Sequence, residues 1–137
     1  GDNKIRKQLA EIFDLSTFAQ AIHPTAVISK RATIQPGTVV MGNAIINSQV
    51  QIGKHVIINT AASIDHDCII GDYAHISPNA TLAGNVTVGE GSWIGAGAVI
   101  IPGIKIGKWC VVGAGAVVIS DVPDGVMVVG NPGRVIN

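Results

Sequence analysis

The chain has 137 residues, the length of one ordinary domain, and 47% of them are hydrophobic while only 13% are charged, so it can bury a substantial core. Nine basic and nine acidic residues give no net charge, which argues against a nucleic-acid partner. The sequence contains neither an apolar run near the ~20 residues of a membrane span nor a signal-peptide pattern, so we expect a cytoplasmic protein with no membrane partner.

The expected core is aliphatic rather than aromatic. Ile and Val supply 38 residues and glycine 17, whereas aromatic residues make up only 4%. Because β-branched residues are stiff in helices and pack well on strands, this composition argues against a helical bundle and indicates regular repetition.

The N-terminal segment, residues 1–20, begins with a predicted amphipathic helix from Asn3 to Asp14. Its apolar side chains recur at roughly helical spacing, and they are Ile5, Leu9, Ile12 and Phe13. This apolar face is expected to dock on something.

A six-residue repeat organises residues 21–119. From Ile22 to Val118 every sixth residue is Ile, Leu or Val, through seventeen consecutive positions. A smaller residue, most often Ala, usually stands two positions earlier, so both columns face inward from short strands. One hexad cannot bury its own aliphatic side chain, whereas stacked coils can. Cys68 and Cys110 fall in the small column, where we expect inert buried thiols and no disulfide.

Each hexad is predicted to be a short strand followed by a sharp corner. Glycine often follows the large aliphatic residue, where the corner needs positive φ or close backbone approach; examples are Gly53, Gly71 and Gly89. The tail, residues 120–137, has two prolines and several glycines. It is predicted to be a turn, a short strand and a loop that caps the open end of the stack.

The uninterrupted hexads resemble those of the hexapeptide-repeat family of left-handed parallel β-helices. The resemblance implies three hexads per triangular coil, a left hand and about five and a half coils. The expected fold is therefore all-β, a left-handed parallel β-helix with a short N-terminal helix and a C-terminal capping segment.

The β-helix fold alone does not indicate an activity, so catalytic groups must come from corner residues that depart from the hexad pattern. The clearest such departure is Asp65-His66-Asp67. Ile64 faces inward, so His66 is expected on the next corner, exposed. A flanking carboxylate can fix the tautomer of a histidine and raise its basicity, as a general base requires; the alternative is an ordinary surface histidine beside acids. Gly84 lies eighteen residues later, directly above His66, where it leaves room and presents an N–H for an oxyanion.

The segments IDHDCIIG, AHIS and AGNV carry a narrower resemblance. They are similar to acetyl-CoA-dependent sugar acetyltransferases, the subgroup of sialic acid O-acetyltransferases and of bacterial N-acetyltransferases that act on UDP-linked 4-amino-4,6-dideoxy sugars. The resemblance implies that His66 takes the proton of the attacking amine or hydroxyl. It also implies that Asp67, more often Glu in the subgroup, raises the basicity of His66, and that the Gly84 amide holds the oxyanion.

The same resemblance implies the remaining partners. His75 is expected near acetyl-CoA, and Ala96 and Ala114 on a groove where this co-substrate runs along a neighbouring subunit. A homotrimer, no metal and a role in bacterial surface polysaccharide or glycan synthesis follow from it. Residues 1–20 resemble the end of an α/β domain that holds the nucleotide sugar. Arg134 either contacts cofactor phosphates or is solvated.

Two other functions stay open from the residues alone, a non-catalytic trimeric scaffold and an enzyme like the zinc-dependent carbonic anhydrases. The latter show a His-x4-His pair, whereas His66 and His75 are nine apart and would have to meet across a subunit boundary. His23, at the first corner, and His55, on an outward mid-face position, are assigned to the surface. The acceptor sugar and the choice between N- and O-acetylation stay open.

Overall fold

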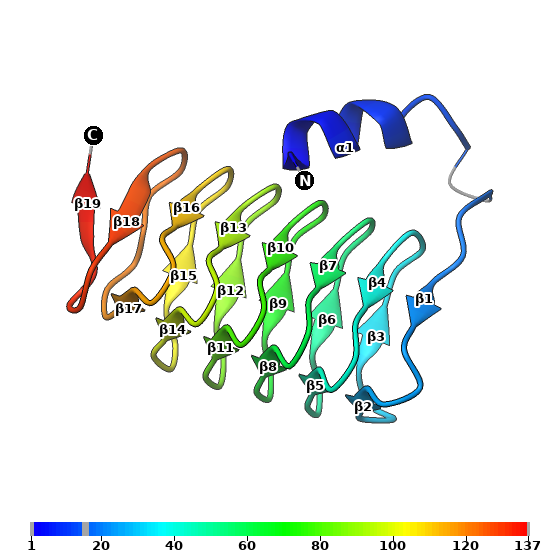
Figure 1. The fold of residues 1–137 in the computed structure, drawn as a ribbon, viewed down its shortest axis with the longest axis horizontal. Coiled ribbons are helices and arrows are strands. Elements are labelled where there is room, and N and C mark those ends of the chain that lie inside the picture. The colour runs from blue at the N-terminus through cyan, green and yellow to red at the C-terminus, as the bar shows by residue number, and fades with distance from the viewer. Residues whose placement is uncertain (1, 15–16, 137) are drawn as a thin grey trace.

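The computed structural model describes residues 2–14 and 17–136, which form a parallel β-helix with helix α1 (Asn3–Ala10) along its side (Figure 1). Three sheets make the three faces of the prism. Face A contains β1 (Ala21–Ile22), β4 (Val39–Val40), β7 (Ile57–Ile58), β10 (His75–Ile76), β13 (Trp93–Ile94), β16 (Val111–Val112), β18 (Met127–Val129) and β19 (Arg134–Ile136). Face B contains β2 (Val27–Ile28), β5 (Ile45–Ile46), β8 (Ser63–Ile64), β11 (Thr81–Leu82), β14 (Val99–Ile100) and β17 (Val117–Val118). Face C contains β3 (Thr33–Ile34), β6 (Gln51–Ile52), β9 (Ile69–Ile70), β12 (Thr87–Val88) and β15 (Lys105–Ile106).

The coil repeat is eighteen residues, as three hexads require. Strands pair in parallel with the strand one coil later, so that His75 lies beside Trp93 and Ile76 beside Ile94. The second residue of each two-residue strand points inward, and along the middle coils these aliphatic side chains are at most 2% exposed. The small column is buried with them, including Ala44 and Cys68 at 0%. The two inward columns predicted from the hexads therefore form the core.

The corners turn through left-handed backbone. Nine non-glycine residues of the described chain have positive φ, among them Asp67 at 59° and Asn85 at 61°. The glycines that follow the large aliphatic residue instead allow the backbones of successive coils to approach closely. A Cβ on Gly89, for example, would overlap the backbone of Gly107 in the next coil. The structure thus supports close backbone approach, rather than positive φ, as the reason for glycine at these positions.

Helix α1 differs from its prediction in length and in orientation. It begins after the N-cap Asp2, whose Oδ1 accepts the N–H groups of Lys4 and Ile5, and it ends at Ala10 rather than Asp14. The predicted apolar face is mostly uncovered within the described residues, although Phe13 contacts Phe18 edge-to-face with 6.2 Å between ring centroids. Its four side chains are 55–71% exposed, and they are Ile5, Leu9, Ile12 and Phe13. The described residues therefore do not cover this face, and the expectation that it docks on something stays a prediction.

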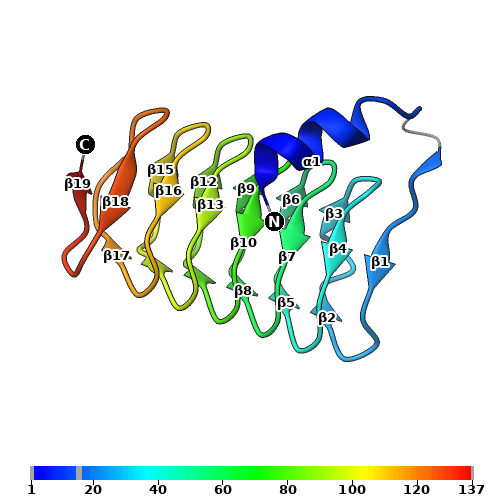
Figure 2. The ribbon, with the colours of Figure 1, turned by 45° about the horizontal axis from the view of Figure 1, so that its top comes forward.

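The polar face of α1 holds the helix against the prism instead, beside the coils of β7 and β10 (Figure 2). Arg6 donates to the carbonyls of His55 at 3.1 Å and Tyr73 at 2.5 Å. Asn3 donates to the carbonyl of Gly91 at 3.0 Å. The long guanidinium reaches main-chain acceptors that an aliphatic side chain cannot satisfy. The described helix is too short and too polar to cross a membrane.

The C-terminal tail covers the last coil, as predicted, with one strand more than expected. β18 continues face A in parallel with β16, and β19 then folds back antiparallel on β18. An antiparallel strand ends the parallel stack at this edge. The loop between them contains the cis peptide bond Asn131-Pro132.

Candidate active site

The corner between β8 and β9 positions the predicted base. His66 Nδ1 and Asp67 Oδ2 lie 2.7 Å apart, and both side chains are exposed. Asp67 is one of the left-handed corner residues. The hydrogen bond to Asp67, with the nearby charge of Asp65, raises the pKa of His66 above its usual value. With Nδ1 held by the carboxylate, Nε2 is the nitrogen left to take a proton.

Asp65 supports this corner from the other side. Its Oδ1 accepts the backbone N–H of His66 at 2.7 Å and the side-chain amide of Asn47 at 3.1 Å. Asn47 stands one coil earlier in the same column, eighteen residues away. Sequence reasoning missed Asn47, although the same step of eighteen that located Gly84 also leads from Asp65 back to it.

Gly84 lies against the imidazole, at the same corner one coil later. A Cβ placed on Gly84 would come within 2.7 Å of both Cε1 and Nε2 of His66. The neighbouring N–H of Asn85 is used, because it donates to the His66 carbonyl at 2.9 Å. No acceptor within residues 2–14 and 17–136 takes the N–H of Gly84. Gly84 therefore leaves the predicted space beside Nε2, and its N–H is free within the described residues.

A second group of predicted residues meets on face A. A hollow of about 460 Å³ is bounded by His75 and by the small corner residues Ala96 and Ala114, with Trp93 and Ser77 between them. We call it the alanine groove. Gly97 and Gly115, which follow the two alanines, would have open space around an added Cβ. An extended chain can therefore lie along this edge without displacing side chains.

His75 is a buried, neutral histidine in this groove. Its ring is 8% exposed and stacks on Trp93 with 5.9 Å between ring centroids and 2° between planes. Burial, with the positive charge of Arg6, lowers the pKa of His75 to about 4. His75 Nδ1 has no hydrogen-bond partner in the described part of the chain.

Asn59 sets the tautomer of His75. Its Oδ1 accepts the N–H of Thr60 at 2.8 Å, so its amide nitrogen faces His75 Nε2 at 3.1 Å and donates to it. The proton of the neutral ring is therefore on Nδ1. Asn59, Ser77 and Trp93 were not identified from the sequence, although Trp93 is eighteen residues after His75 and a column search would have found it.

The two groups of residues lie at different corners. His66, Asp67 and Gly84 are at the corner from face B to face C, whereas Ala96 and Ala114 are at the corner from face A to face B. Within one chain the structure does not bring the histidine corner and the alanine groove together. This separation is the arrangement expected if each site is made by two subunits.

The remaining cysteines and histidines lie outside the two groups described above. Cys68 and Cys110 are buried free thiols, as predicted, and burial raises the pKa of Cys68. His23 is exposed, but the assignment of His55 was wrong, since it sits at a corner with positive φ and is only 5% exposed. Its ring stacks on Tyr73 at 5.3 Å beneath the α1 segment.

No group of three or more His, Cys, Asp and Glu side chains in residues 2–14 and 17–136 is arranged to hold a metal ion. Arg134 is exposed on β19, where its Nη1 donates to the carbonyl of Gly133 at 3.1 Å.

Comparison with known proteins identifies relatives of this repeat fold. The family model of the bacterial transferase hexapeptide (six repeats) matches residues 49–84 and 85–120. UDP-N-acetylbacillosamine N-acetyltransferase of Bacillus subtilis (strain 168) is 51% identical over 43 residues, which cover 30% of this chain and 20% of that protein.

Solved structures match over nearly the whole chain. The acetyltransferase domain of PglB from Neisseria gonorrhoeae FA1090, in complex with acetyl coenzyme A, is 41% identical with a TM-score of 0.94; the match covers 98% of this chain and 67% of that one. PerB from Caulobacter crescentus, in complex with CoA and GDP-perosamine, is 41% identical with a TM-score of 0.95 and coverage of 99% and 67%. The chain spans about two thirds of these solved chains. The match to their fold confirms the predicted left-handed parallel β-helix.

Proposed function

The chain belongs to the family of bacterial hexapeptide-repeat transferases, and on this premise we propose that it transfers the acetyl group of acetyl-CoA to the amine of a nucleotide-linked amino sugar. The observation that carries the proposal is the pairing of a carboxylate-held His66 with the free amide of Gly84. The named relatives support the reaction class, since one is an N-acetyltransferase and two are solved with acetyl-CoA or CoA.

In the proposed reaction the sugar amine attacks the thioester carbonyl of acetyl-CoA. His66 Nε2 takes a proton from the amine as the new C–N bond forms, while Asp67 stabilises the imidazolium through Nδ1. The C–S bond then breaks, and the proton passes to the departing sulfur to give CoA thiol and the acetamido sugar. Holding both substrates in one place supplies much of the rate.

Gly84 is proposed to stabilise the charge that develops on the carbonyl oxygen. Its N–H has no acceptor among the described residues, and the residue lies against the His66 imidazole, so an oxyanion bound by this N–H would be near the base. A main-chain donor of this kind is already oriented before the reaction starts, which is why it lowers the barrier.

Acetyl-CoA is proposed to bind along the alanine groove. Ala96 and Ala114 leave an open edge for the pantetheine arm, and His75 faces it as a neutral residue. With its proton on Nδ1, the ring is a donor for a ligand carbonyl. A charged histidine is not needed for this role, consistent with the low pKa of His75.

A homotrimer is proposed as the active form, with the sites between subunits. The support is geometric, because His66 and the alanine groove lie at different corners of one prism. Apolar side chains in the outer row of face B supply a surface for such contact, with Val27 63% exposed and Ile45 41% exposed. We also retain the expected cytoplasmic location.

Residues 1–20 are proposed to be the end of an α/β domain that holds the nucleotide sugar. The exposed apolar face of α1 supports this proposal. Ile5, Leu9 and Phe13 are each more than half exposed. A face of this kind is normally buried. The prism, residues 21–119, and the cap, residues 120–137, are then the catalytic and closing parts.

The test is an acetyl-transfer assay with acetyl-CoA and a panel of UDP- and GDP-linked amino sugars. We expect His66→Ala to lower kcat/KM by about 10²- to 10⁴-fold. His23→Ala is the matched control because it removes another exposed corner histidine. Wild-type rates for His66→Ala would overturn the mechanism. Absence of any acetyl-CoA binding by calorimetry would instead favour a non-catalytic scaffold.

A further inference from the structure

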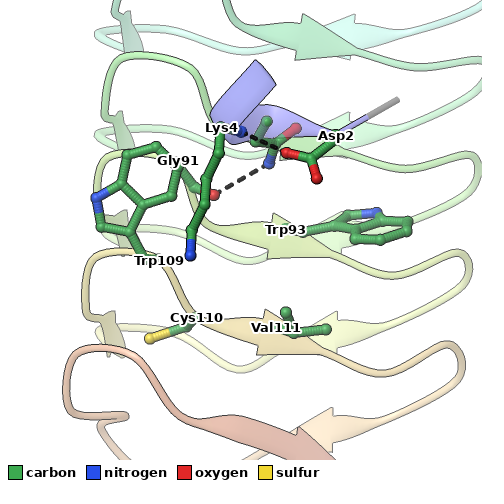
Figure 3. A pocket seen from close by; sticks show the side chains of 8 residues that line it. Asp2, Lys4, Gly91, Trp93, Trp109, Cys110 and Val111 are labelled. Carbon is green, nitrogen blue, oxygen red and sulfur yellow. Dashed lines mark hydrogen bonds between the residues drawn. The ribbon is translucent and has the colours of Figure 1, made fainter. Parts of the chain in front are cut away.

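Face A carries a second hollow, on the other side of Trp93 from the alanine groove. It measures about 460 Å³ and is bounded by Trp93, Trp109, Val111 and Lys4, with Gly91 at its back (Figure 3). We call it the tryptophan hollow. Trp93 and Val111 line both hollows, so a molecule in one borders a molecule in the other.

Trp109 is fixed in place by its neighbours. It occupies a left-handed corner position with φ of 55°, and its ring fills the space that a Cβ on Gly91 would overlap. Lys7 Nζ lies 5.8 Å from the centre of the same ring, and a salt bridge of 2.6 Å to Glu90 holds Lys7. One wall of the tryptophan hollow is thus rigid before any ligand arrives.

Trp93 is held just as firmly. One face of the indole stacks on His75, and Nε1 donates to Ser77 Oγ at 2.7 Å. The side chain is nevertheless 44% exposed. A large aromatic surface that is both fixed and exposed is typical of a ligand-binding surface rather than of packing.

The rim of the hollow carries one basic side chain, Lys4, and one acidic side chain, Asp2. Hydrogen bonds from the backbone N–H groups of Ile5 and Lys4 lower the pKa of Asp2, and the Lys4 charge helps to lower it. Lys4 is exposed, and its ammonium makes no hydrogen bond or salt bridge within residues 2–14 and 17–136. Asp2, which also borders the hollow, directs Oδ1 to the backbone N–H groups of Lys4 and Ile5 as the N-cap of α1. Lys4 is thus available to a ligand, and an ammonium binds phosphate as a point charge.

We propose that the tryptophan hollow is the acceptor site, where the hexose of a nucleotide-linked amino sugar packs on the indoles and its phosphate meets Lys4; this inference rests on the proposed function. The apolar face of a hexose ring matches two indoles and the Val111 side chain. The sugar amine then lies at Trp93, the shared wall, next to the acetyl-CoA groove. The nucleotide extends toward Lys4 and α1.

The two walls give a direct optical test, because Trp93 and Trp109 are the two tryptophans of the whole sequence. In Trp93→Phe only Trp109 emits, and in Trp109→Phe only Trp93 emits. We expect the nucleotide-linked amino sugar to change the emission of both single-tryptophan variants saturably. Acetyl-CoA should change only that of Trp109→Phe, since Trp109 does not line the alanine groove.

Kinetics provide a second readout on the same site. Loss of one charge-assisted contact in Lys4→Met should raise the KM for the nucleotide sugar roughly tenfold, with the KM for acetyl-CoA unchanged. Lys108→Met is the matched control, because Lys108 is an exposed lysine that does not border the hollow. We expect it to leave both KM values unchanged.

The outcomes separate the two proposals. The acceptor site is wrong if the enzyme turns over the sugar while the sugar leaves the Trp109 emission unchanged and Lys4→Met leaves its KM unchanged. That result does not affect the proposed acetyltransferase function. No turnover, with neither tryptophan responding to acetyl-CoA, overturns the function and the acceptor site together.

Discussion

His66 Nδ1 and Asp67 Oδ2 lie 2.7 Å apart, although they are consecutive residues whose side chains would point apart on a regular strand. The left-handed backbone at Asp67, with φ of 59°, turns its carboxylate back toward the preceding ring. The corner geometry therefore builds a base and its orienting partner from two adjacent positions.

We expect Asp67→Asn to weaken the base without disturbing the corner, because asparagine tolerates positive φ. The Asp67 carboxylate raises the pKa of His66, so its loss lowers that pKa and moves the acid limb of the kcat/KM profile to lower pH. The plateau should fall by roughly 10- to 100-fold, less than for removal of the base itself. A pH profile with an unmoved acid limb contradicts this role.

Gly84→Ala should displace the imidazole. The new Cβ would stand 2.7 Å from Cε1 and Nε2 of His66, while the Gly84 backbone itself lies outside the positive-φ set. We expect kcat to fall by about 10²-fold or more, because base and oxyanion donor lose their alignment, with little change in melting temperature. Gly42→Ala is the control: its Cβ would approach the His23 ring only to 3.3 Å, and normal activity is expected.

Asn59→Asp should change the protonation of His75. A carboxylate at this position accepts a hydrogen bond, so it favours a proton on Nε2 in place of Nδ1 and stabilises the charged ring. The pKa of His75 should therefore rise from about 4, which an NMR titration of the ring nitrogens measures. The signals of His23 serve as an internal reference. A His75 that still titrates near 4 shows that Asn59 does not set its tautomer.

Most of the fold could be predicted because one physical requirement repeats along the chain. A single aliphatic residue must face inward once per hexad, so a count of six locates each strand from Ile22 to Val118, and a count of eighteen stacks Gly84 on His66. Steps of eighteen also connect Asp65 with Asn47 and His75 with Trp93. These neighbours were predictable in principle from the same register.

The docking of α1 and the burial of His55 could not be predicted from the hexad repeat or from helical spacing. Helical spacing shows which face of α1 is apolar, but it does not show that Arg6 binds three main-chain carbonyls of the prism and turns that face outward. The burial of His55 was not predictable either, since Phe18, which follows α1 in the chain, contacts its ring with 4.5 Å between centroids. Contacts between a long polar side chain and backbone groups leave no periodic signal in a sequence.

Arg6→Ala should release α1 while leaving the prism intact. The guanidinium donates to the carbonyls of His55, Tyr73 and Ala74 and to the Asn3 side chain, and loss of these bonds should cost about 1–3 kcal/mol of local stability. Amide hydrogen exchange should accelerate in residues 3–10 and stay slow in the coils. Gln8→Ala, on an exposed position of the same helix, controls for truncation itself. Equal protection of α1 in both variants contradicts the docking role of Arg6.

Mixing two inactive variants tests whether each site is built from two chains. Ala114→Trp should block the alanine groove, and His66→Ala removes the base, which lies at another corner. If the sites lie between subunits, a heterotrimer places an intact His66 from one chain beside an intact groove from the next. Random mixing in equal amounts should then restore about a quarter of the wild-type sites, because one in four interfaces combines the two intact halves. If both halves of a site belong to one chain, the refolded mixture stays inactive at every ratio, and the intersubunit site is wrong.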